Sequence, residues 1–154
     1  MSLVESSALL RHVRGWPTVS YRPGDVLVQS GARSGKLLVL KEGRVEVSSQ
    51  GVALGTIDTP GAILGEMAAL LERPHTADVR AAAATVCYVA DAATVLREDS
   101  VVALHVAVVL AQRVDLHTEA LVALKRKGGG AGAGKAIDQS IEQLAKAVVL
   151  GGFA

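Results

Sequence analysis

The chain has 154 residues, of which half are hydrophobic but only 3% are aromatic, so we expect one domain whose core consists of aliphatic side chains. Sixteen basic and fifteen acidic residues give a net charge of +1 at pH 7, which argues against a protein that binds nucleic acid with its whole surface. The single cysteine, Cys87, excludes an internal disulfide framework and a cysteine-rich zinc site.

No secretory signal is recognisable, because the start of the chain lacks a basic region followed by a long apolar run. The most apolar stretch, residues 101–111, is about half as long as a bilayer-spanning helix and contains His105. We therefore expect a cytoplasmic protein that does not insert into a membrane.

Turn signals divide the first half of the chain into short segments. Pairs such as Pro23-Gly24 and Pro60-Gly61 recur at intervals of about eight to twelve residues, a spacing typical of small β-sandwiches and barrels. Residues 44–48 alternate polar and apolar side chains, as a half-buried strand does. The predicted strands cover residues 18–22, 26–29, 37–40, 44–48, 52–57, 77–82 and 85–89. Cys87, in the last of them, is most simply a small core residue.

The pattern becomes helical in the second half. A long helix is predicted for residues 100–127, a stretch without glycine or proline. Asp99 or Ser100 is a plausible N-cap for it, because both side chains can accept hydrogen bonds from the first free N–H groups. Shorter helices are expected at residues 6–13 and 92–96.

The predicted long helix has two apolar faces. One is a seam with alternating steps of four and three residues, typical of a coiled coil; it comprises Ala103, Ala107, Leu110, Val114, His117, Leu121 and Leu124. The second stripe comprises Val102, Val106, Val109 and Leu116. A helix that packs only on its own domain needs one stripe. We therefore expect one face of the helix to cover the β-domain and the other face, within residues 103–124, to contact the same helix of a second copy in a homodimer. The alternative is a helix that is buried on two sides within one monomer.

Residues 128–134 are rich in glycine and have the composition of a flexible linker. Residues 129–135 also fit the start of a phosphate-binding P-loop, but Ala136 lacks the hydroxyl that would hold magnesium, and no strand precedes the segment. Apolar residues then recur at helical spacing, namely Ile137, Ile141, Leu144, Ala145 and Val148. The chain is thus predicted to consist of a domain at residues 1–127, a linker at residues 128–135 and a short amphipathic helix at residues 136–154.

Four histidines raise the question of a metal site: His12, His75, His105 and His117. No two of them are spaced as i, i+2 or i, i+4, and the sequence contains no nucleophile elbow. The sequence therefore gives little support to a metal-dependent barrel enzyme. We expect no metal, no cofactor and no enzymatic activity.

Residues 65–79, GEMAALLERPHTADV, form the most informative segment. Gly65 permits a close backbone approach, and residues 67–71 could start a single helical turn whose free N–H groups would point at an anion. Glu66 does not suit a phosphate, but its carboxylate suits a sugar hydroxyl. The plain alternative is an Ω-like surface loop that contains a helical turn.

The same segment resembles the phosphate-binding cassette of cyclic nucleotide-binding domains. That cassette has the form Gly-Glu-hydrophobic-Ala/Ser, a short spacer and Pro-Arg-Thr/Ser-Ala-x-Val, and the segment matches it without a gap, except that His75 stands at the arginine position. Residues 21–25 and 38–47 resemble early strands of the same family. The resemblance covers about residues 5–126 and implies a mainly β fold with α: an antiparallel, jelly-roll-like β-roll followed by a long C-terminal dimerisation helix.

The resemblance also implies a role for each cassette residue. Glu66 would bind the ribose 2′-hydroxyl of a cyclic nucleotide, cAMP or cGMP. The residues that would line the phosphate are Gly65, Met67, Ala68 and Thr76. His75 would face the phosphate with one donor that is charged only part of the time, whereas an arginine offers a permanent charge and a bidentate fork.

Residues 111–119 resemble the dimer helix of the catabolite activator proteins. In that family an arginine lies near the phosphate and two small polar residues reach the purine; Arg113, His117 and Thr118 occupy those positions. Arg113 would then partly offset the loss of the arginine at position 75. Without the resemblance, Arg113 is a solvated helix residue and His117 a tolerated position in the seam.

The activators carry a helix-turn-helix domain after this helix, whereas a linker and one short predicted helix follow it here. We therefore expect no direct DNA binding. Our hypothesis is a sensor domain for a cyclic nucleotide or a similar phosphate ligand that signals through a dimer helix. The rival is a β-roll that has lost its ligand and serves as a dimerisation or protein-docking module. His75 favours the rival, and the retained Glu66 and Arg113 weigh against it.

Overall fold

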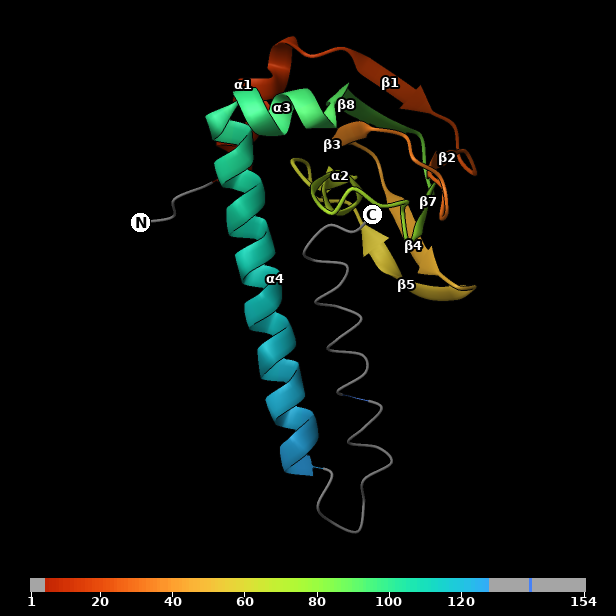
Figure 1. Ribbon diagram of the computed structural model, residues 1–154. Coiled ribbons are helices and arrows are strands. Elements are labelled where there is room, and N and C mark those ends of the chain that lie inside the picture. Colours follow the sequence, from red (N-terminus) through yellow and green to blue (C-terminus); the bar gives the residue numbers. More distant parts are fainter. Residues whose placement is uncertain (1–4, 128–138, 140–154) are drawn as a thin grey trace.

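The computed structural model describes residues 5–127 and Gln139. The described residues form a β-roll of two four-stranded sheets, with helices on one side of it and one long helix that extends past the roll (Figure 1). The predicted linker at residues 128–135 and, apart from Gln139, the predicted helix at residues 136–154 lie outside the described residues.

Both sheets are antiparallel, in the orders β1-β8-β3-β6 and β2-β7-β4-β5. The strands are β1 (Thr18–Tyr21), β2 (Val26–Val28), β3 (Lys36–Glu42), β4 (Val45–Ser49), β5 (Val52–Ile57), β6 (Ile63–Leu64), β7 (Asp78–Ala81) and β8 (Thr85–Asp91). Each strand expected from the sequence is present; β5 has the predicted bounds, and the ends of the others differ by at most two residues. β6 was missed because two residues are too few to show an alternating pattern.

Strand β3 is buried on both of its faces, because the first sheet separates two cores. Leu38 and Leu40 belong to the core inside the roll, which also contains Val45, Val47, Val79 and Cys87. Leu37 and Val39 belong to the core beneath the helices, which also contains Leu9, Val13, Val102 and Val106. Successive strand residues point to opposite faces, so a strand between two cores has a continuous apolar run. The prediction of Cys87 as a core residue is confirmed.

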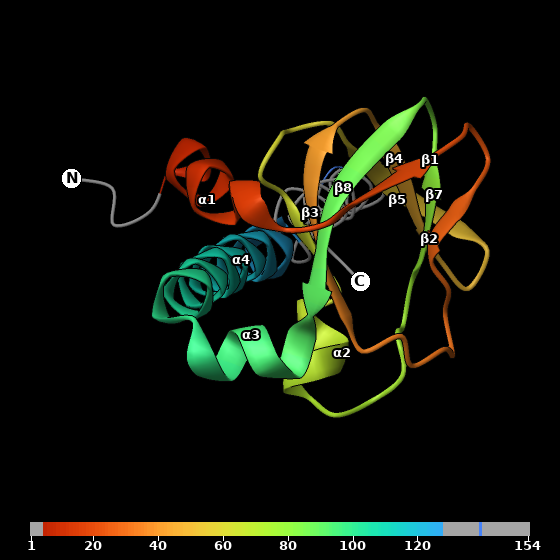
Figure 2. The same ribbon diagram turned by 90° about the horizontal axis from the view of Figure 1, so that it is seen from above.

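Helices cover the outer face of the first sheet (Figure 2). They are α1 (Ser6–His12) with a 3-10 turn (Val13–Gly15), α3 (Ala92–Glu98) and α4 (Ser100–Lys127), while α2 (Glu66–Leu70) follows β6. α1 and α3 both contact α4. The helices expected at residues 6–13, 92–96 and 100–127 are confirmed, and the bounds predicted for α4 agree with the structure.

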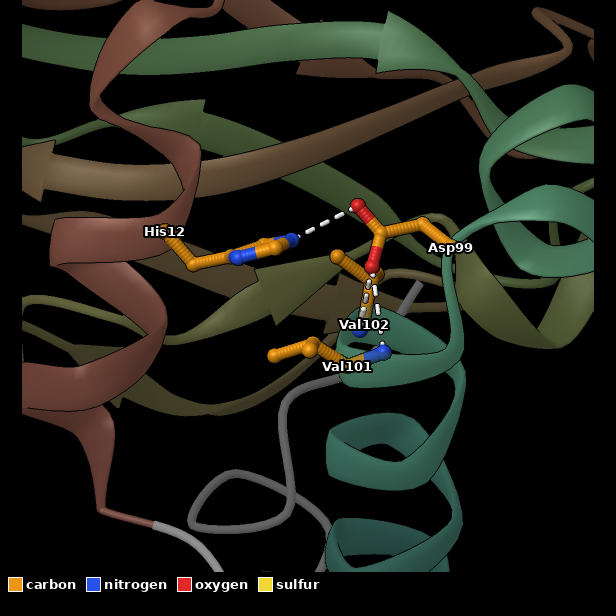
Figure 3. A network of polar contacts seen from close by, with 4 residues as sticks. All are labelled: His12, Asp99, Val101 and Val102. Carbon is orange, nitrogen blue, oxygen red and sulfur yellow. Dashed lines mark hydrogen bonds and ion pairs between the residues drawn. The ribbon is translucent and has the colours of Figure 1, made fainter.

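Asp99, one of the two predicted N-caps, ties the start of α4 to α1 (Figure 3). Its Oδ1 accepts hydrogen bonds from the backbone N–H groups of Val101 and Val102, both at 3.1 Å. Its Oδ2 lies 2.7 Å from Nε2 of His12. Burial raises the pKa of the Asp99 carboxyl, but the hydrogen bonds from His12 and the two backbone groups outweigh burial and lower it.

Only part of the second apolar stripe predicted for α4 packs against the domain. Val106 is buried, but Leu116 of the same stripe is 38% exposed, and the buried side continues through Arg113 instead. The predicted seam is largely open, since Val114 is 65% and Leu121 is 54% exposed. This exposure contradicts the alternative of a helix buried on two sides within one monomer.

By length and composition alone, Ser100–Arg126 of α4 is also apolar enough to cross a membrane, with a mean hydropathy of 1.3 and 22% of that window buried. The sequence-based argument that the apolar stretch is too short to span a bilayer applied to residues 101–111 only. The helix is longer, so that argument is wrong for α4 as a whole. A helix packed on a soluble domain passes the same test. Val106 and Arg113 of this helix are buried against the domain.

We predict that Asp99→Ala lowers the free energy of unfolding by about 1–2 kcal/mol, because it removes the N-cap of α4 and the contact with His12. Urea denaturation followed by circular dichroism measures the change. Asp99→Asn is the matched control, since its side-chain oxygen still caps the helix, and it should lose less stability. Equal losses in the two variants would contradict the capping role.

Candidate functional site

Gly65 makes the turn from β6 into α2 possible. Its φ of +96° lies in the left-handed region, which residues with a Cβ atom rarely adopt. A Cβ atom here would also collide with the backbone carbonyl oxygen of Lys36, at the start of β3. Only glycine lets α2 begin this close to β3, and this is the close backbone approach expected from the sequence.

α2 places its first residue, Glu66, against α4. Glu66 Oε1 lies 3.0 Å from Arg113 Nη2, and the two side chains are 1% and 4% exposed. The second oxygen, Oε2, is buried and has no hydrogen-bond partner among the described residues. Desolvation offsets much of the attraction in a buried ion pair, so stability alone does not account for this arrangement.

Burial also governs the charges of this pair. It raises the pKa of the Glu66 carboxyl to about 7, although Arg113 acts in the opposite direction. It lowers the pKa of the Arg113 guanidinium, against the attraction of Glu66. Since an arginine keeps its proton at neutral pH, Glu66 is the member of the pair that titrates in that range.

His75 is buried and faces the loop between β2 and β3. Its Nε2 lies 2.8 Å from Ser34 Oγ. Its backbone N–H donates to the carbonyl of Ala32 at 2.9 Å, and its carbonyl accepts from the N–H of Gly31 at 2.8 Å. Side chain and backbone together hold the end of the cassette to this loop.

The other cassette residues are less buried. Met67 and Ala68, on α2, are partly buried, and Thr76 is exposed. The carbonyl of Thr76 accepts a hydrogen bond from Ser49 Oγ at 2.9 Å. The cassette therefore contacts the start of β3 through Gly65 and the end of β4 through Thr76.

On α4 the structure separates the two predicted purine contacts. His117 lies one turn after Arg113, on the same side of the helix, and its Nε2 is buried without a hydrogen-bond partner among the described residues. Thr118 lies about 140° around the helix from Arg113. It is exposed, and its hydroxyl donates to the carbonyl of Val114 at 2.9 Å.

A pocket of about 250 Å³ lies between the β2–β3 loop and α2. We call it the loop pocket; its polar lining is Arg33, Ser34, Glu72, Arg73 and His75. It brings Gly65, Ala68 and His75 of the predicted set together, whereas neither Glu66 nor Arg113 lines it. Sequence reasoning missed Arg33 and Ser34, because no local signal connects that loop with a segment so far along the chain.

Among the described residues, no three His, Cys, Asp or Glu side chains lie close enough to hold a metal ion. His12 pairs with Asp99 instead. His105 is buried in α4, and burial lowers its pKa. The metal-dependent barrel therefore has no candidate centre in this part of the chain.

A family model described as "Cyclic nucleotide-binding domain" matches residues 18–98, just over half of the chain. No curated protein sequence matches the chain. The solved structures that it resembles include PKAR CBD2 bound to Sp-2Cl-cAMPS, with 20% identity and a TM-score of 0.52, covering 58% of this chain and 70% of that one.

Two further similar structures come from named organisms. One is a cAMP-binding acyltransferase from Mycobacterium smegmatis, with 25% identity and a TM-score of 0.51, covering 71% of this chain and 36% of that one. The other is the regulatory subunit of a cAMP-independent protein kinase A from Trypanosoma brucei, with 21% identity and a TM-score of 0.50, covering 53% of this chain and 30% of that one. This chain thus spans well under half of these two proteins.

We predict that the free energy of unfolding falls as the pH rises from about 4.5 to about 7. Because burial raises the pKa of Glu66 from 4.5 to about 7, the folded chain keeps a proton that the unfolded chain releases over this range. The contribution is fully present below the lower value, is lost through the upper one, and amounts to roughly 3 kcal/mol. Urea denaturation at a series of pH values measures it.

Glu66→Gln is the control for this titration, since it keeps the shape of the side chain and removes the proton exchange. The variant should show a flatter dependence on pH over the same range. A slope that is unchanged in Glu66→Gln would assign the effect to another group.

Proposed function

This chain belongs to the cyclic nucleotide-binding domain family, and we propose that it is a regulatory sensor domain for cAMP, cGMP or a related phosphate ligand. The observation that carries the proposal is the buried carboxylate of Glu66, at the start of α2 in the cassette. Its Oε1 is engaged by Arg113. Its Oε2 has no hydrogen-bond partner among the described residues and suits the hydroxyl of a ribose.

Arg113 gives the sensor a physical link between ligand and helix. Its guanidinium, held by Glu66, supplies a positive charge for a nearby phosphate, and His117 lies one turn further along the same side of α4. A ligand that contacts both the cassette and this side of α4 would favour one position of the helix over another. Differential affinity for two helix positions is what makes such a domain a switch.

The dimer is supported by the open seam of α4. Val114 and Leu121 are large apolar side chains with more than half of their surface exposed, and a second copy of the helix would cover them. Thr118 lies on the side of α4 that carries Val114 rather than Arg113. In a dimer it would therefore approach the ligand bound to the partner copy.

The rival function, a ligand-free docking module, rests on His75. An imidazole bonded to Ser34 offers a phosphate less charge than the arginine of the family pattern. The similar regulatory subunit from Trypanosoma brucei belongs to a kinase described as cAMP-independent, so the fold is compatible with a protein of that kind.

We further propose that the chain acts in the cytoplasm without catalysis of its own, and binds neither DNA nor a membrane directly. The long helix or the segments after it would contact the output partner. The similar acyltransferase from Mycobacterium smegmatis illustrates that such a fold also occurs within a longer enzyme.

We predict that cAMP or cGMP binds saturably at about pH 6 and that Glu66→Ala abolishes this binding, because the variant loses the acceptor for the ribose and the partner of Arg113. Isothermal titration calorimetry measures it. Glu46→Ala, which removes an exposed carboxylate of β4, is the matched control and should bind normally. Absence of heat and of thermal stabilisation with either nucleotide in the wild-type chain would leave the docking module as the function.

The pH dependence of binding tests His75. A bound phosphate favours the protonated imidazole, so affinity should fall as the pH rises and His75 loses its proton. His75→Gln should lack this component, and His75→Arg should bind about tenfold more tightly through a charge-assisted bond. Identical pH profiles for wild type and His75→Gln would assign the phosphate to Arg113 or other groups.

We predict that Leu121→Glu weakens dimerisation at least about tenfold, because a charge on the seam would have to be buried between two helices. Sedimentation equilibrium measures the association constant. Val52→Glu is the control, since Val52 is also a large exposed apolar residue but lies on β5. A wild-type chain that is monomeric at all concentrations would contradict the dimer.

A further inference from the structure

The side of α4 that faces the roll is buried beyond the point where the two cores end. Among the described residues, Leu110 is the last one of α4 that packs on the core beneath the helices. Ala120 follows ten residues later, about 15 Å further along the helix, and belongs to neither core. It is nevertheless only 3% exposed, much like Arg113 at 4%. A further layer on this side of α4, outside the two cores, therefore covers Ala120.

This side is distinct from the open seam proposed for the dimer. Four residues share it, and we call them the inner side of α4: Arg113, His117, Ala120 and Leu124. All four are buried or partly buried. Val114 and Leu121 of the seam lie roughly 60–100° around the helix from the middle of the inner side and are largely exposed. A second copy that covered the seam would leave the inner side to another occupant.

Residues 137–148 have the pattern of a helix that fits the inner side. Their apolar residues recur at helical spacing and fall on one side of a helix; they are Ile137, Ile141, Leu144, Ala145 and Val148. Gln139 is helical and exposed in the structure, and the spacing places it about 180° from this apolar side. At this position the structure agrees with a helix whose polar side faces water.

The lengths match in an antiparallel arrangement. The connection, residues 128–135, has eight residues, within the range for neighbouring helices. The apolar side of the segment and the inner side of α4 each extend over eleven residue steps, or about 16 Å. A pairing that begins with Ile137 beside Leu124 sets Ile141 beside Ala120, whose methyl group leaves room for the larger side chain.

Charges favour the same orientation. α4 ends with three basic residues at positions 125–127, and the first turns of the segment carry Asp138 and Glu142, against one basic residue, Lys135. In the antiparallel pairing these opposite charges lie at the same end of the two helices. Exposed ion pairs add little stability, but they favour this orientation over the parallel one.

We propose that residues 137–148 form a helix that packs antiparallel on the inner side of α4. The short connection holds the segment near α4 at an effective concentration of about 1 mM, which favours it over a second copy or a separate partner. The docked helix covers His117. Under the proposed function, on which this consequence rests, a nucleotide also contacts His117, so the docked helix and the ligand compete.

The test is disulfide formation between Ala120→Cys and Ile141→Cys in the full 154-residue chain. Two cysteines react only when their Cα atoms come within about 7 Å, and the natural Cys87 is buried. We expect a cross-link within one chain, at a rate independent of protein concentration. Val122→Cys in place of Ala120→Cys is the matched control. It lies on the opposite side of α4 and should cross-link at least about tenfold more slowly.

Two charge variants, each added to the cysteine pair, test the apolar contact. Leu144→Glu places a charge on the apolar side of the segment and should slow the cross-link at least about tenfold. Gln139→Glu adds the same charge at an exposed position and should leave the rate unchanged. The proposal is overturned if the two cysteine pairs react alike, if the cross-link joins two copies of the chain, or if both charge variants slow it equally.

Isothermal titration calorimetry with cAMP and cGMP tests the competition. Leu144→Glu, without the cysteines, should bind the nucleotide at least about threefold more tightly than the wild type, because a docked fraction lowers the apparent affinity. Gln139→Glu should bind like the wild type. Equal affinities in Leu144→Glu and the wild type would overturn the competition. Binding by neither would overturn the proposed function and with it the competition, while the cross-link still decides whether the segment docks.

Discussion

The middle of strand β3, Leu37 to Leu40, is buried on both faces, and the position of the site depends on this constraint. Leu38 and Leu40 point into the core of the roll, and Leu37 and Val39 point into the core beneath the helices. Separating the roll from the helices would therefore expose aliphatic side chains of β3 to water, which is unfavourable. The cassette, residues 65–79, also contacts the start of β3 and the loop that precedes it. The carbonyl of Lys36 excludes any side chain at position 65, and the loop just before the strand holds His75 by backbone and side chain.

The apolar packing of α4 brings one charged group to the roll. Val102 and Val106 set the first turns of the helix on the core beneath β3, and two turns later Arg113 meets Glu66 inside the protein. Burial works against the charge of both groups, since it raises the pKa of the carboxyl and lowers that of the guanidinium. Such a pair adds little to stability, and under the proposed function a ligand on the carboxylate would change the contact that holds α4 against the roll. This sensitivity is the physical basis of the proposed switch.

His75 changes the electrostatics of the cassette without removing its shape. The backbone of this segment is tied to the β2–β3 loop, and the ring lies between the cassette and Ser34. An arginine would bring a permanent charge to the same place, whereas the imidazole leaves the neighbouring arginines, Arg33 and Arg73, as the fixed positive charges of the loop pocket. The departure from the family pattern therefore removes one fixed positive charge from the cassette and leaves its backbone contacts in place.

Local patterns in the sequence determined most of the fold. Most strand and helix positions and Gly65 at the turn depend on residues close to one another in the chain, and the family resemblance assigned Glu66 and Arg113 to one site. The sequence left Asp99 and Ser100 as alternative caps of α4, and the structure selects Asp99. Only the tertiary structure decided that Glu66 and Arg113 pair across 47 residues and that His75 faces Ser34. The spacing of residues in the sequence determines which of them lie on the same side of a helix. Which residues of other elements that side contacts depends on how the two cores pack against β3.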